Sequence, residues 1–314
     1  MSSELKELVV VGAGPSALAA AIYTTREDID TTLYEKGVVG GLAAVTDQID
    51  NYPGFTDGVA GMKLASELQG QAERFGTKIE YGDVSALKRD GNEIELIVDG
   101  RPVRSKAVLV ATGSNYRKLD VPGEDELYGR GVHYCATCDG AFYRERRLIV
   151  VGGGNSAVQE AMFLTRFATH IDLMVRSRLR ASEVLQQELQ KYVDEGKITV
   201  HIGATTDEVL IADDKFAGIK TTKDGAQTEL MADGLFVLIG LIPNTTFLEG
   251  SGVELDPLGH VVTDKHLATN VKGVFASGDV RSGATMQIAS AVGEGASAAL
   301  AIREYLDELK REEA

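Results

Sequence analysis

A strand-length apolar run that meets a glycine turn and then an alanine-rich stretch opens this chain, and the same order returns once. The first copy spans residues 8–22 and the second spans residues 148–161. From Gly12 to Gly152 the offset is 140 residues (152 − 12). A strand, a glycine turn and a helix in this order begin a doubly wound parallel sheet. The sequence therefore predicts an α/β protein with two Rossmann-like dinucleotide-binding domains.

The first glycine turn carries the pattern Gly12-x-Gly14-x-x-Ala17. The first glycine permits the tight turn, the second lets the backbone approach a pyrophosphate, and the small third residue packs helix against strand. Glu35 ends the next predicted strand, 21 positions after Gly14, where an acid can accept hydrogen bonds from a ribose. The alternative is a glycine turn in an α/β core that binds no ligand.

The second turn, Gly152-x-Gly154-x-x-Ala157, differs at the position that follows its second strand. Val175 stands where the first copy has its acid, and Arg176, Arg178 and Arg180 come next. An acid repels a ribose 2′-phosphate, whereas arginines bind it with several donors. The first site is thus predicted to take FAD or NAD and the second NADPH. A solvated basic face is the alternative for the arginines.

The only two cysteines, Cys135 and Cys138, lie three positions apart and are followed by Asp139. This spacing can close a reducible disulfide, and the adjoining Asp139 can transfer a proton to it, provided that burial raises the pKa of its carboxyl. A zinc half-site with His133 as a third ligand is the alternative, although zinc usually takes four ligands; an inert thiol pair is another. Two dinucleotide sites and a dithiol together predict a relay in which a flavin passes electrons from a nicotinamide to a disulfide.

Charge and apolar-run length restrict the partners. The formal net charge of −15 disfavours nucleic acid and anionic membranes. No apolar run approaches the ~20 residues that span a bilayer. The first seven residues lack a basic stretch followed by an apolar core, so we expect no secretion signal and a cytoplasmic location.

Several further elements are predicted from local pattern. We expect a strand at 31–35, a helix at 61–75, a strand ending near 113, a strand at 170–175, and a final helix at 284–310. Polar segments at 116–130 and at Pro243-Asn244 are the expected crossings between domains.

The chain resembles the low-molecular-weight thioredoxin reductases over nearly its whole length. The motifs that carry the resemblance are GAGP at 12–15, GG at 40–41, NYPGF at 51–55, ATG at 111–113, YCATCDG at 134–140, GGGNSA at 152–157 and SGD at 277–279. The cysteine block just before the second glycine turn is the most specific of them. The resemblance implies a discontinuous FAD domain at 1–115 and 245–314 and an inserted NADPH domain at 116–244, in a homodimer whose domains rotate.

The resemblance also implies roles for individual residues. Cys138 would face the flavin, Cys135 would attack the disulfide of thioredoxin, and Asp139 would protonate the departing thiolate. The residues implied to hold FAD are Gly12, Gly14, Pro15, Ala17, Glu35, Gly41, Asn51, Ala111, Thr112, Gly113, Gly278, Asp279, Met286, Gln287 and Ile288. Those implied to hold NADPH are Gly152, Gly154, Asn155, Ser156, Ala157, Arg176 and Arg180.

Three positions depart from the family's usual pattern. Val175-Arg176-Ser177 stands where the family usually has His-Arg-Arg, and the segment to Arg180 is one residue shorter, so one phosphate-binding arginine is expected to be missing. Asn155 replaces an aspartate, and Met286 replaces an arginine. These departures leave the electron donor open, and two alternatives stand beside an NADPH-dependent thioredoxin reductase. One is a related dithiol flavoenzyme that uses NADH, ferredoxin or another donor, or reduces a different disulfide. The other is a flavin-containing redox sensor that binds a partner without turnover.

Overall fold

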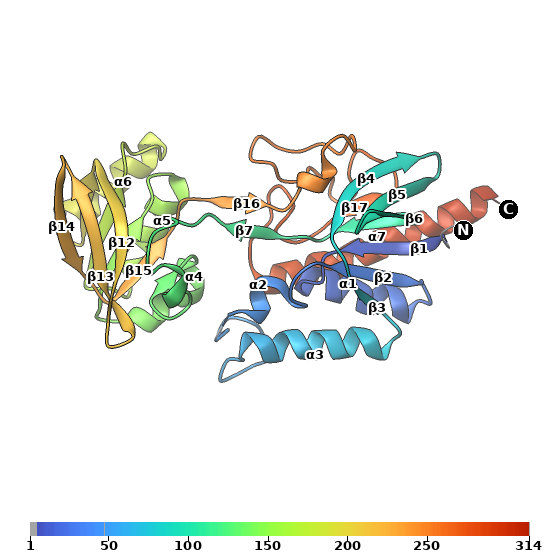
Figure 1. The fold of residues 1–314 in the computed structure, drawn as a ribbon, viewed down its shortest axis with the longest axis horizontal. Helices are drawn as coiled ribbons and strands as arrows, with labels where there is room; N and C mark the ends of the chain where they lie inside the picture. The colour runs from blue at the N-terminus through green and yellow to red at the C-terminus, as the bar shows by residue number, and fades with distance from the viewer. Residues whose placement is uncertain (1–4, 47, 314) are drawn as a thin grey trace. The chain divides into compact units, whose positions relative to one another are not determined.

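The computed structural model describes residues 5–46 and 48–313. Residues 1–4, on which the expectation about a secretion signal partly rests, lie outside this range. The chain divides into two compact units, one made of residues 1–115 and 242–314 and the other of residues 116–241. Two short strands, β7 (Ser114–Tyr116) and β16 (Leu241–Pro243), pair where the chain passes between the units (Figure 1).

The first unit is built on a seven-stranded sheet with the order β3-β2-β1-β6-β5-β4, in which β17 also pairs with β6. Strands β1, β2, β3, β6 and β17 are parallel, whereas β4 and β5 form an antiparallel hairpin that continues along the first half of β6. The strands are β1 (Lys6–Val11), β2 (Thr31–Glu35), β3 (Lys78–Tyr81), β4 (Val84–Asp90), β5 (Glu93–Val98), β6 (Arg101–Val110) and β17 (Val274–Ala276).

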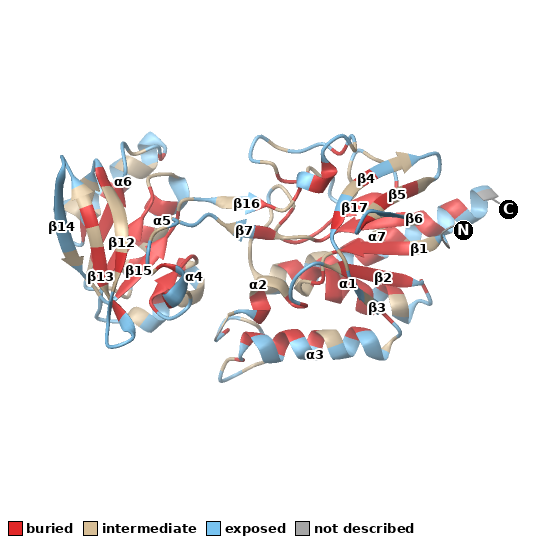
Figure 2. Cartoon of the chain, in the orientation of Figure 1, coloured by how far each residue is buried: buried red, intermediate tan, exposed pale blue. Residues whose placement is uncertain are grey.

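Both faces of this sheet are covered, which explains why β1 ends in an unbroken run of buried apolar residues, Leu8 to Val11. Leu8 and Val10 lie in a core closed by α1 (Pro15–Arg26), α3 (Gly61–Arg74) and α7 (Ile288–Glu313), whereas Val9 and Val11 lie in a second core on the other side. Buried residues run along the central strands of this sheet (Figure 2). The helices are α1 (Pro15–Arg26), α2 (Gly41–Ala44), α3 (Gly61–Arg74), α7 (Ile288–Glu313) and the 3₁₀ turn η3 (Thr246–Leu248).

The second unit contains a five-stranded parallel sheet with the order β11-β10-β9-β15-β8 and an antiparallel sheet of β12, β13 and β14. Helices cover one face of the parallel sheet and the antiparallel sheet covers the other. The strands are β8 (Val132–His133), β9 (Arg147–Val151), β10 (His170–Val175), β11 (Ile198–Ile202), β12 (Ala204–Ala212), β13 (Lys215–Lys223), β14 (Ala226–Met231) and β15 (Gly234–Val237). The helices are η1 (Asp125–Leu127), α4 (Ala136–Asp139), η2 (Gly140–Tyr143), α5 (Asn155–Leu164) and α6 (Glu183–Asp194).

One buried carboxylate ties three strands of this parallel sheet together. The Asp172 carboxylate accepts hydrogen bonds from Arg147 Nε at 2.9 Å and from His201 Nε2 at 2.8 Å, and Arg147 Nη2 lies 2.7 Å away. Burial by itself would raise the pKa of Asp172, but the hydrogen bonds from His201 and Arg147 and the Arg147 charge bring the pKa below its usual value. This cluster fixes β9 and β10, whose carboxyl ends lead into the second glycine turn and the arginine segment.

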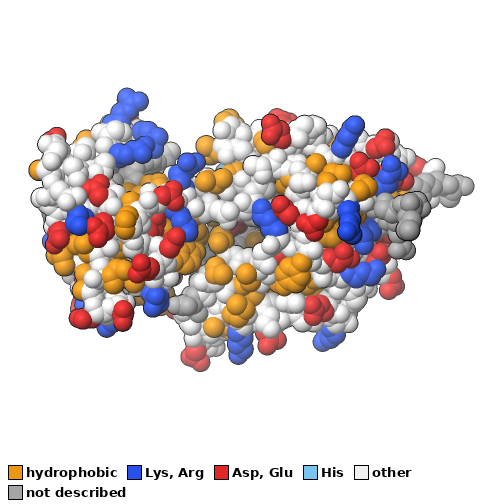
Figure 3. All heavy atoms as spheres, viewed as in Figure 1, with side chains coloured by type: hydrophobic (Ala, Val, Ile, Leu, Met, Phe, Trp, Pro, Cys, Tyr) orange, Lys and Arg blue, Asp and Glu red, His pale blue; other side chains and the backbone are white. Residues whose placement is uncertain are grey.

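The predicted α/β class with two Rossmann-like units is confirmed. In the described part of the chain, no helix combines the length and the apolar composition that crossing a bilayer requires. On the face seen in Figure 3, acidic and basic side chains are interspersed over each unit.

Candidate functional site

The first glycine turn follows β1 and begins α1. Gly12 has φ +100°, and a Cβ there would lie 2.6 Å from the carbonyl oxygen of Ala111. Ala17 is fully buried, and Pro15 occupies the first turn of α1. At Gly14, by contrast, a Cβ would meet no atom within 4 Å. The turn is therefore closed at Gly12 and open at Gly14, so the space at the amino end of α1 fits a pyrophosphate.

The Glu35 carboxylate closes the far side of this turn. Its Oε2 accepts a hydrogen bond from Ala13 N at 2.7 Å, and its Oε1 accepts one from Gly37 N at 2.7 Å. Gly41 lies close by, because a Cβ at this residue would be 3.7 Å from the Gly14 Cα. The structure thus brings together the glycine turn and the acid after β2, as the spacing predicted. It also places the start of α2 there, which the spacing did not predict.

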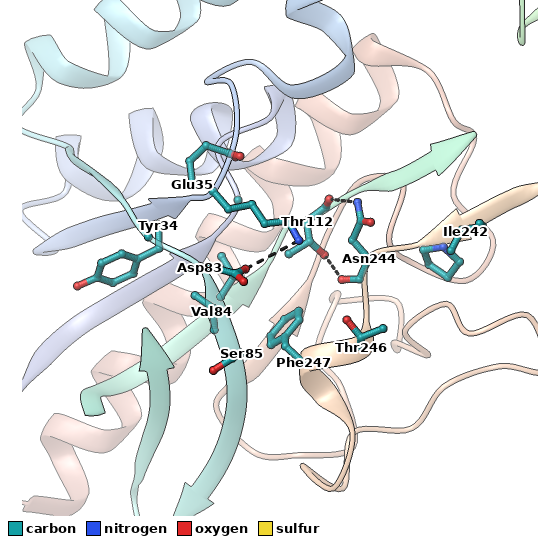
Figure 4. A pocket seen from close by; sticks show the side chains of 15 residues that line it. Tyr34, Glu35, Asp83, Val84, Ser85, Thr112, Ile242, Asn244, Thr246 and Phe247 are labelled. Atoms are coloured by element: carbon teal, nitrogen blue, oxygen red, sulfur yellow. Dashed lines mark hydrogen bonds and ion pairs between the residues drawn. The ribbon is translucent and has the colours of Figure 1, made fainter. Parts of the chain in front are cut away.

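Beside Glu35 lies a cavity of ≈ 360 Å³, at the edge where parallel strands β1, β2 and β3 end (Figure 4). On one side of the cavity, two hydrogen bonds join Thr112 and Asn244. Thr112 Oγ1 donates to Asn244 O at 2.8 Å, and Asn244 Nδ2 donates to Thr112 O at 2.9 Å. The lining is Val11, Gly12, Tyr34, Glu35, Lys36, Gly82, Asp83, Val84, Ser85, Thr112, Ile242, Pro243, Asn244, Thr246 and Phe247.

Most of these lining residues were not predicted from the sequence. Lys36 and Asp83 form an ion pair at 3.8 Å, and Val84 and Phe247 supply apolar surface. They come from segments far apart in sequence that the sheet order brings to one edge. A cavity with walls that are partly apolar and partly polar, next to an acid that can accept hydrogen bonds from a ribose, fits an aromatic base with its sugar.

The segment after β17 carries the other predicted acid. The half-buried Asp279 carboxyl accepts no hydrogen bond from any described residue, and burial together with the nearby Glu294 charge raises its pKa. Glu294 Oε2 in turn accepts Gly278 N at 2.8 Å and Arg281 Nε at 3.1 Å, which fixes the turn that presents Asp279. An unsatisfied, half-buried carboxyl of this kind suits a polyhydroxyl chain that can donate to it.

The start of α7 lies near another predicted contact residue. Asn51 Nδ2 donates to Gln287 Oε1 at 3.1 Å, so these two predicted residues meet. The predicted start of this helix at 284 is wrong, because α7 begins at Ile288 and Met286 has φ +56°. Ala111 and Gly113 flank Thr112 at the end of β6, and a Cβ at Gly113 would face open space.

The second glycine turn repeats the geometry of the first. A Cβ at Gly152 would lie 2.4 Å from Leu238 O, whereas at Gly154 it would meet nothing within 4 Å. Ala157 is fully buried, while Asn155 and Ser156 are exposed at the amino end of α5. The same fit to a pyrophosphate therefore holds here.

The arginine segment is fastened to this second turn. Arg180 N donates to Gly153 O at 2.6 Å, and Ser182 N donates to Asn155 Oδ1 at 2.9 Å. Arg176, Arg178 and Arg180 are exposed, and within the described ranges none of them belongs to an ion pair. Their guanidinium groups are thus available to an anion at the carboxyl edge of the sheet.

The two cysteines form a disulfide in the same unit. Cys135 and Cys138 are bonded with a Cα–Cα distance of 5.3 Å, and both are half-buried. Ala136 N donates to Glu160 Oε2 on α5 at 3.0 Å, which joins the disulfide turn to the helix of the second glycine motif. Asp139 ends α4, and its side chain is 18% exposed. The predicted disulfide is confirmed, and it excludes a zinc half-site in this state.

The chain matches a family model described as pyridine nucleotide-disulphide oxidoreductase over residues 6–295. It is 41% identical to a thioredoxin reductase of Listeria monocytogenes, covering 99% of this chain and 97% of the relative. A thioredoxin reductase of Bacillus subtilis is 37% identical over 99% of this chain and 98% of its own length. The crystal structure of a thioredoxin reductase from Streptococcus pyogenes superposes with a TM-score of 0.92 at 34% identity, covering 98% of this chain and 100% of that chain.

Proposed function

Because this chain belongs to the pyridine nucleotide-disulphide oxidoreductase family, we propose that it is a thioredoxin reductase that carries electrons from NADPH to the disulfide of thioredoxin. Membership of the family implies a flavin and a pyridine nucleotide, and the proposal makes these FAD and NADPH. The single observation that carries it is the Cys135–Cys138 disulfide, fastened to the helix of a glycine turn that fits a dinucleotide.

The first unit is assigned to FAD. The open side of Gly14 and the amino end of α1 would receive the pyrophosphate, and the cavity beside Glu35 would receive the adenine and its ribose. Asp279 would accept hydrogen bonds from the ribityl chain. When bound, FAD supplies a carrier that accepts a hydride from a nicotinamide and passes two electrons to a disulfide.

The second unit is assigned to NADPH and to the dithiol. Gly154 and Asn155 would lie at the pyrophosphate, and Arg176 and Arg180 at the 2′-phosphate. In the reduced protein, Cys135 Sγ attacks the substrate disulfide and Cys138 Sγ then displaces the substrate by closing the Cys135–Cys138 bond. Asp139 holds the proton that the departing thiolate receives.

The central test uses the purified holoprotein with NADPH and thioredoxin. The wild type should oxidise NADPH over many turnovers, whereas Cys138→Ser should retain its yellow flavin and stop reducing thioredoxin. A colourless protein that cannot be reconstituted with FAD, or undiminished turnover by Cys138→Ser, would contradict the proposal. Multiple turnovers would also eliminate a non-catalytic redox sensor.

A second candidate differs only in the electron donor or the disulfide. The segment Val175-Arg176-Ser177, where the family usually has His-Arg-Arg, is the observation that favours it, because one arginine that would bind a 2′-phosphate is missing. Anaerobic flavin bleaching with NADPH and with NADH separates the donors. Arg176→Ala should weaken NADPH far more than NADH; slow bleaching by both nucleotides would point to another reductant such as ferredoxin.

The proposal includes a homodimer in the cytoplasm. The resemblance implies the first, and the sparse use of cysteine as a reactive pair favours the second. Measurement of the native mass by light scattering tests the dimer, which would have twice the 33.5 kDa of one chain.

A further inference from the structure

A histidine side chain lies between the Asp139 carboxyl and the Tyr143 phenol. His133 Nδ1 is 3.2 Å from Asp139 Oδ2, and His133 Nε2 is 2.7 Å from the Tyr143 oxygen. The imidazole is 5% exposed and stacks on Phe236 with ring centroids 5.2 Å apart. Three polar groups are therefore held in a row beside the disulfide turn.

The tautomer of His133 follows from its two neighbours in the row, Tyr143 and Asp139. Burial, and next the charges of Asp139 and Asp233, raise the pKa of Tyr143 well above its usual value, so the phenol keeps its proton. A phenol that donates to His133 Nε2 places the imidazole proton on Nδ1, where it can be donated to Asp139. The opposite tautomer would turn the Nδ1 lone pair toward the carboxylate at 3.2 Å, which is unfavourable.

This arrangement leaves one carboxyl oxygen for chemistry. Asp139 Oδ2 can accept the Nδ1–H of His133 whether or not the carboxyl is protonated, so Oδ1 is the oxygen that can carry a transferable proton. Once that proton has left, the same hydrogen bond becomes charge-assisted and stronger. The imidazole thus orients the acid before proton transfer and stabilises the carboxylate afterwards.

We propose that His133 is the positioning residue for proton donation by Asp139 during disulfide reduction, with Tyr143 fixing its tautomer. The inference rests on the proposed function. In the step concerned, the Cys135 thiolate forms a bond to one substrate sulfur and the substrate S–S bond breaks. The leaving sulfur keeps the electron pair of that bond and takes the proton from Asp139 Oδ1. Asp139 remains as a carboxylate that accepts the Nδ1–H of His133.

Other titratable groups face this row from every packed element, and the experiment must separate them. They are Glu160 on α5, Asp233 before β15, and Tyr128, which interacts with Asp139. An Asp139→Asn variant identifies the pH transition that belongs to Asp139 itself, because it leaves all the others in place.

The test compares the wild type with His133→Phe, which keeps a ring on Phe236 but removes both nitrogen contacts. We expect kcat for thioredoxin to fall about tenfold, part of the ~10²–10⁴ that a general acid contributes, with KM unchanged. The pH at which kcat declines should rise, because the carboxylate has lost its donor. His133→Asn, whose amide N–H can replace Nδ1–H, should recover part of both effects, and Tyr143→Phe should show a smaller loss. His266→Ala, at an exposed loop position of the first unit, is the control for a histidine change.

A second measurement does not depend on thioredoxin or on the electron donor. The chemically reduced wild type is alkylated with iodoacetamide across pH, and the transition that Asp139→Asn abolishes is assigned to Asp139. His133→Phe should move this transition to higher pH. An unmoved transition would overturn the inference, as would a loss of kcat with an unchanged pH profile, because a merely structural role has that signature. A wild type without thioredoxin turnover would refute the proposed function, and the alkylation profile would still decide the role of His133.

Discussion

Gly12 and Gly14 lie two positions apart in one turn, and alanine at each should have opposite consequences. At Gly12, an alanine Cβ would lie 2.6 Å from Ala111 O, with the backbone in the left-handed region at φ +100°. Backbone strain of this kind costs ~1–3 kcal/mol, and overpacking costs about as much again. At Gly14 the backbone has φ −73° and ψ 179°, which alanine adopts freely, and its Cβ would meet no atom within 4 Å.

Thermal melting of the flavin-free protein separates the two effects, because a bound ligand would itself raise the melting temperature. Gly12→Ala should lower the melting temperature of the first unit by about 4–24 °C, from ~2–6 kcal/mol at ~2–4 °C per kcal/mol. Gly14→Ala should shift it by less than about 2 °C, as expected for a substitution that costs under ~0.5 kcal/mol.

In a flavin titration, by contrast, the substitution at Gly14 should have a clear effect on FAD affinity. Its Cβ would occupy the open side of the turn, where the backbone has to approach the pyrophosphate, so FAD should bind at least ~10-fold more weakly, a loss of ~1.4 kcal/mol. If Gly14→Ala bound FAD with wild-type affinity, the assignment of this turn to the pyrophosphate would be wrong. If Gly12→Ala melted with the wild type, the steric reasoning would be refuted.

Three further substitutions test buried polar groups. The pKa of Asp172 in the folded protein lies below the ~3.9 of an unfolded chain. The ionised carboxylate therefore contributes stability above that pH, and this contribution is lost as the pH falls through the folded pKa. The melting temperature of Asp172→Asn should accordingly fall less steeply than that of the wild type between pH 6 and pH 3. Burial raises the pKa of Glu160 despite the hydrogen bond that it accepts from Ala136 N, so ionisation of this carboxyl removes stability as the pH rises. The melting temperature of Glu160→Gln should therefore rise relative to that of the wild type as the pH is raised from 4.5 to 8. A difference that stays constant over this range would contradict the reasoning. Ser16→Ala leaves the buried hydroxyl of Ser277 without its partner at 2.6 Å and should cost ~1–3 kcal/mol in a denaturant melt, whereas a cost near zero would mean that the pair contributes nothing.

Local spacing was sufficient to predict the elements whose information lies within a few residues. The strand at 31–35 and the helix that begins at Gly61 have the predicted starts, and the disulfide lies where two cysteines three positions apart can close one. The final helix starts four residues later than predicted, at Ile288. Met286 takes a left-handed backbone conformation, φ +56°, which periodicity of side chains does not reveal.

Residues that meet through the sheet order could not be predicted in this way. Asp83 and Phe247 come to the cavity beside Glu35 only because β3, β2 and β1 are neighbours and a distant segment crosses their ends. Likewise, the sequence indicated His133 only as a possible zinc ligand. Its place between Asp139 and Tyr143 depends on how a two-residue strand, a four-residue helix and a 3₁₀ turn follow one another. The position of the His133 side chain is therefore specified by the whole segment 132–143 and by no shorter residue pattern.

The departure at residue 155 illustrates how a change of residue type can keep a geometry and alter its electrostatics. Asn155 Oδ1 accepts Ser182 N at 2.9 Å, which is the contact that an aspartate oxygen would make at this place. The amide therefore keeps the arginine segment fastened to the glycine turn. It does so without a negative charge at the amino end of α5, where a carboxylate would compete with a phosphate for the helix dipole and for Arg180. Asn155 thus favours anion binding at the second turn, and it offsets in part the arginine that is missing from the segment Val175-Arg176-Ser177.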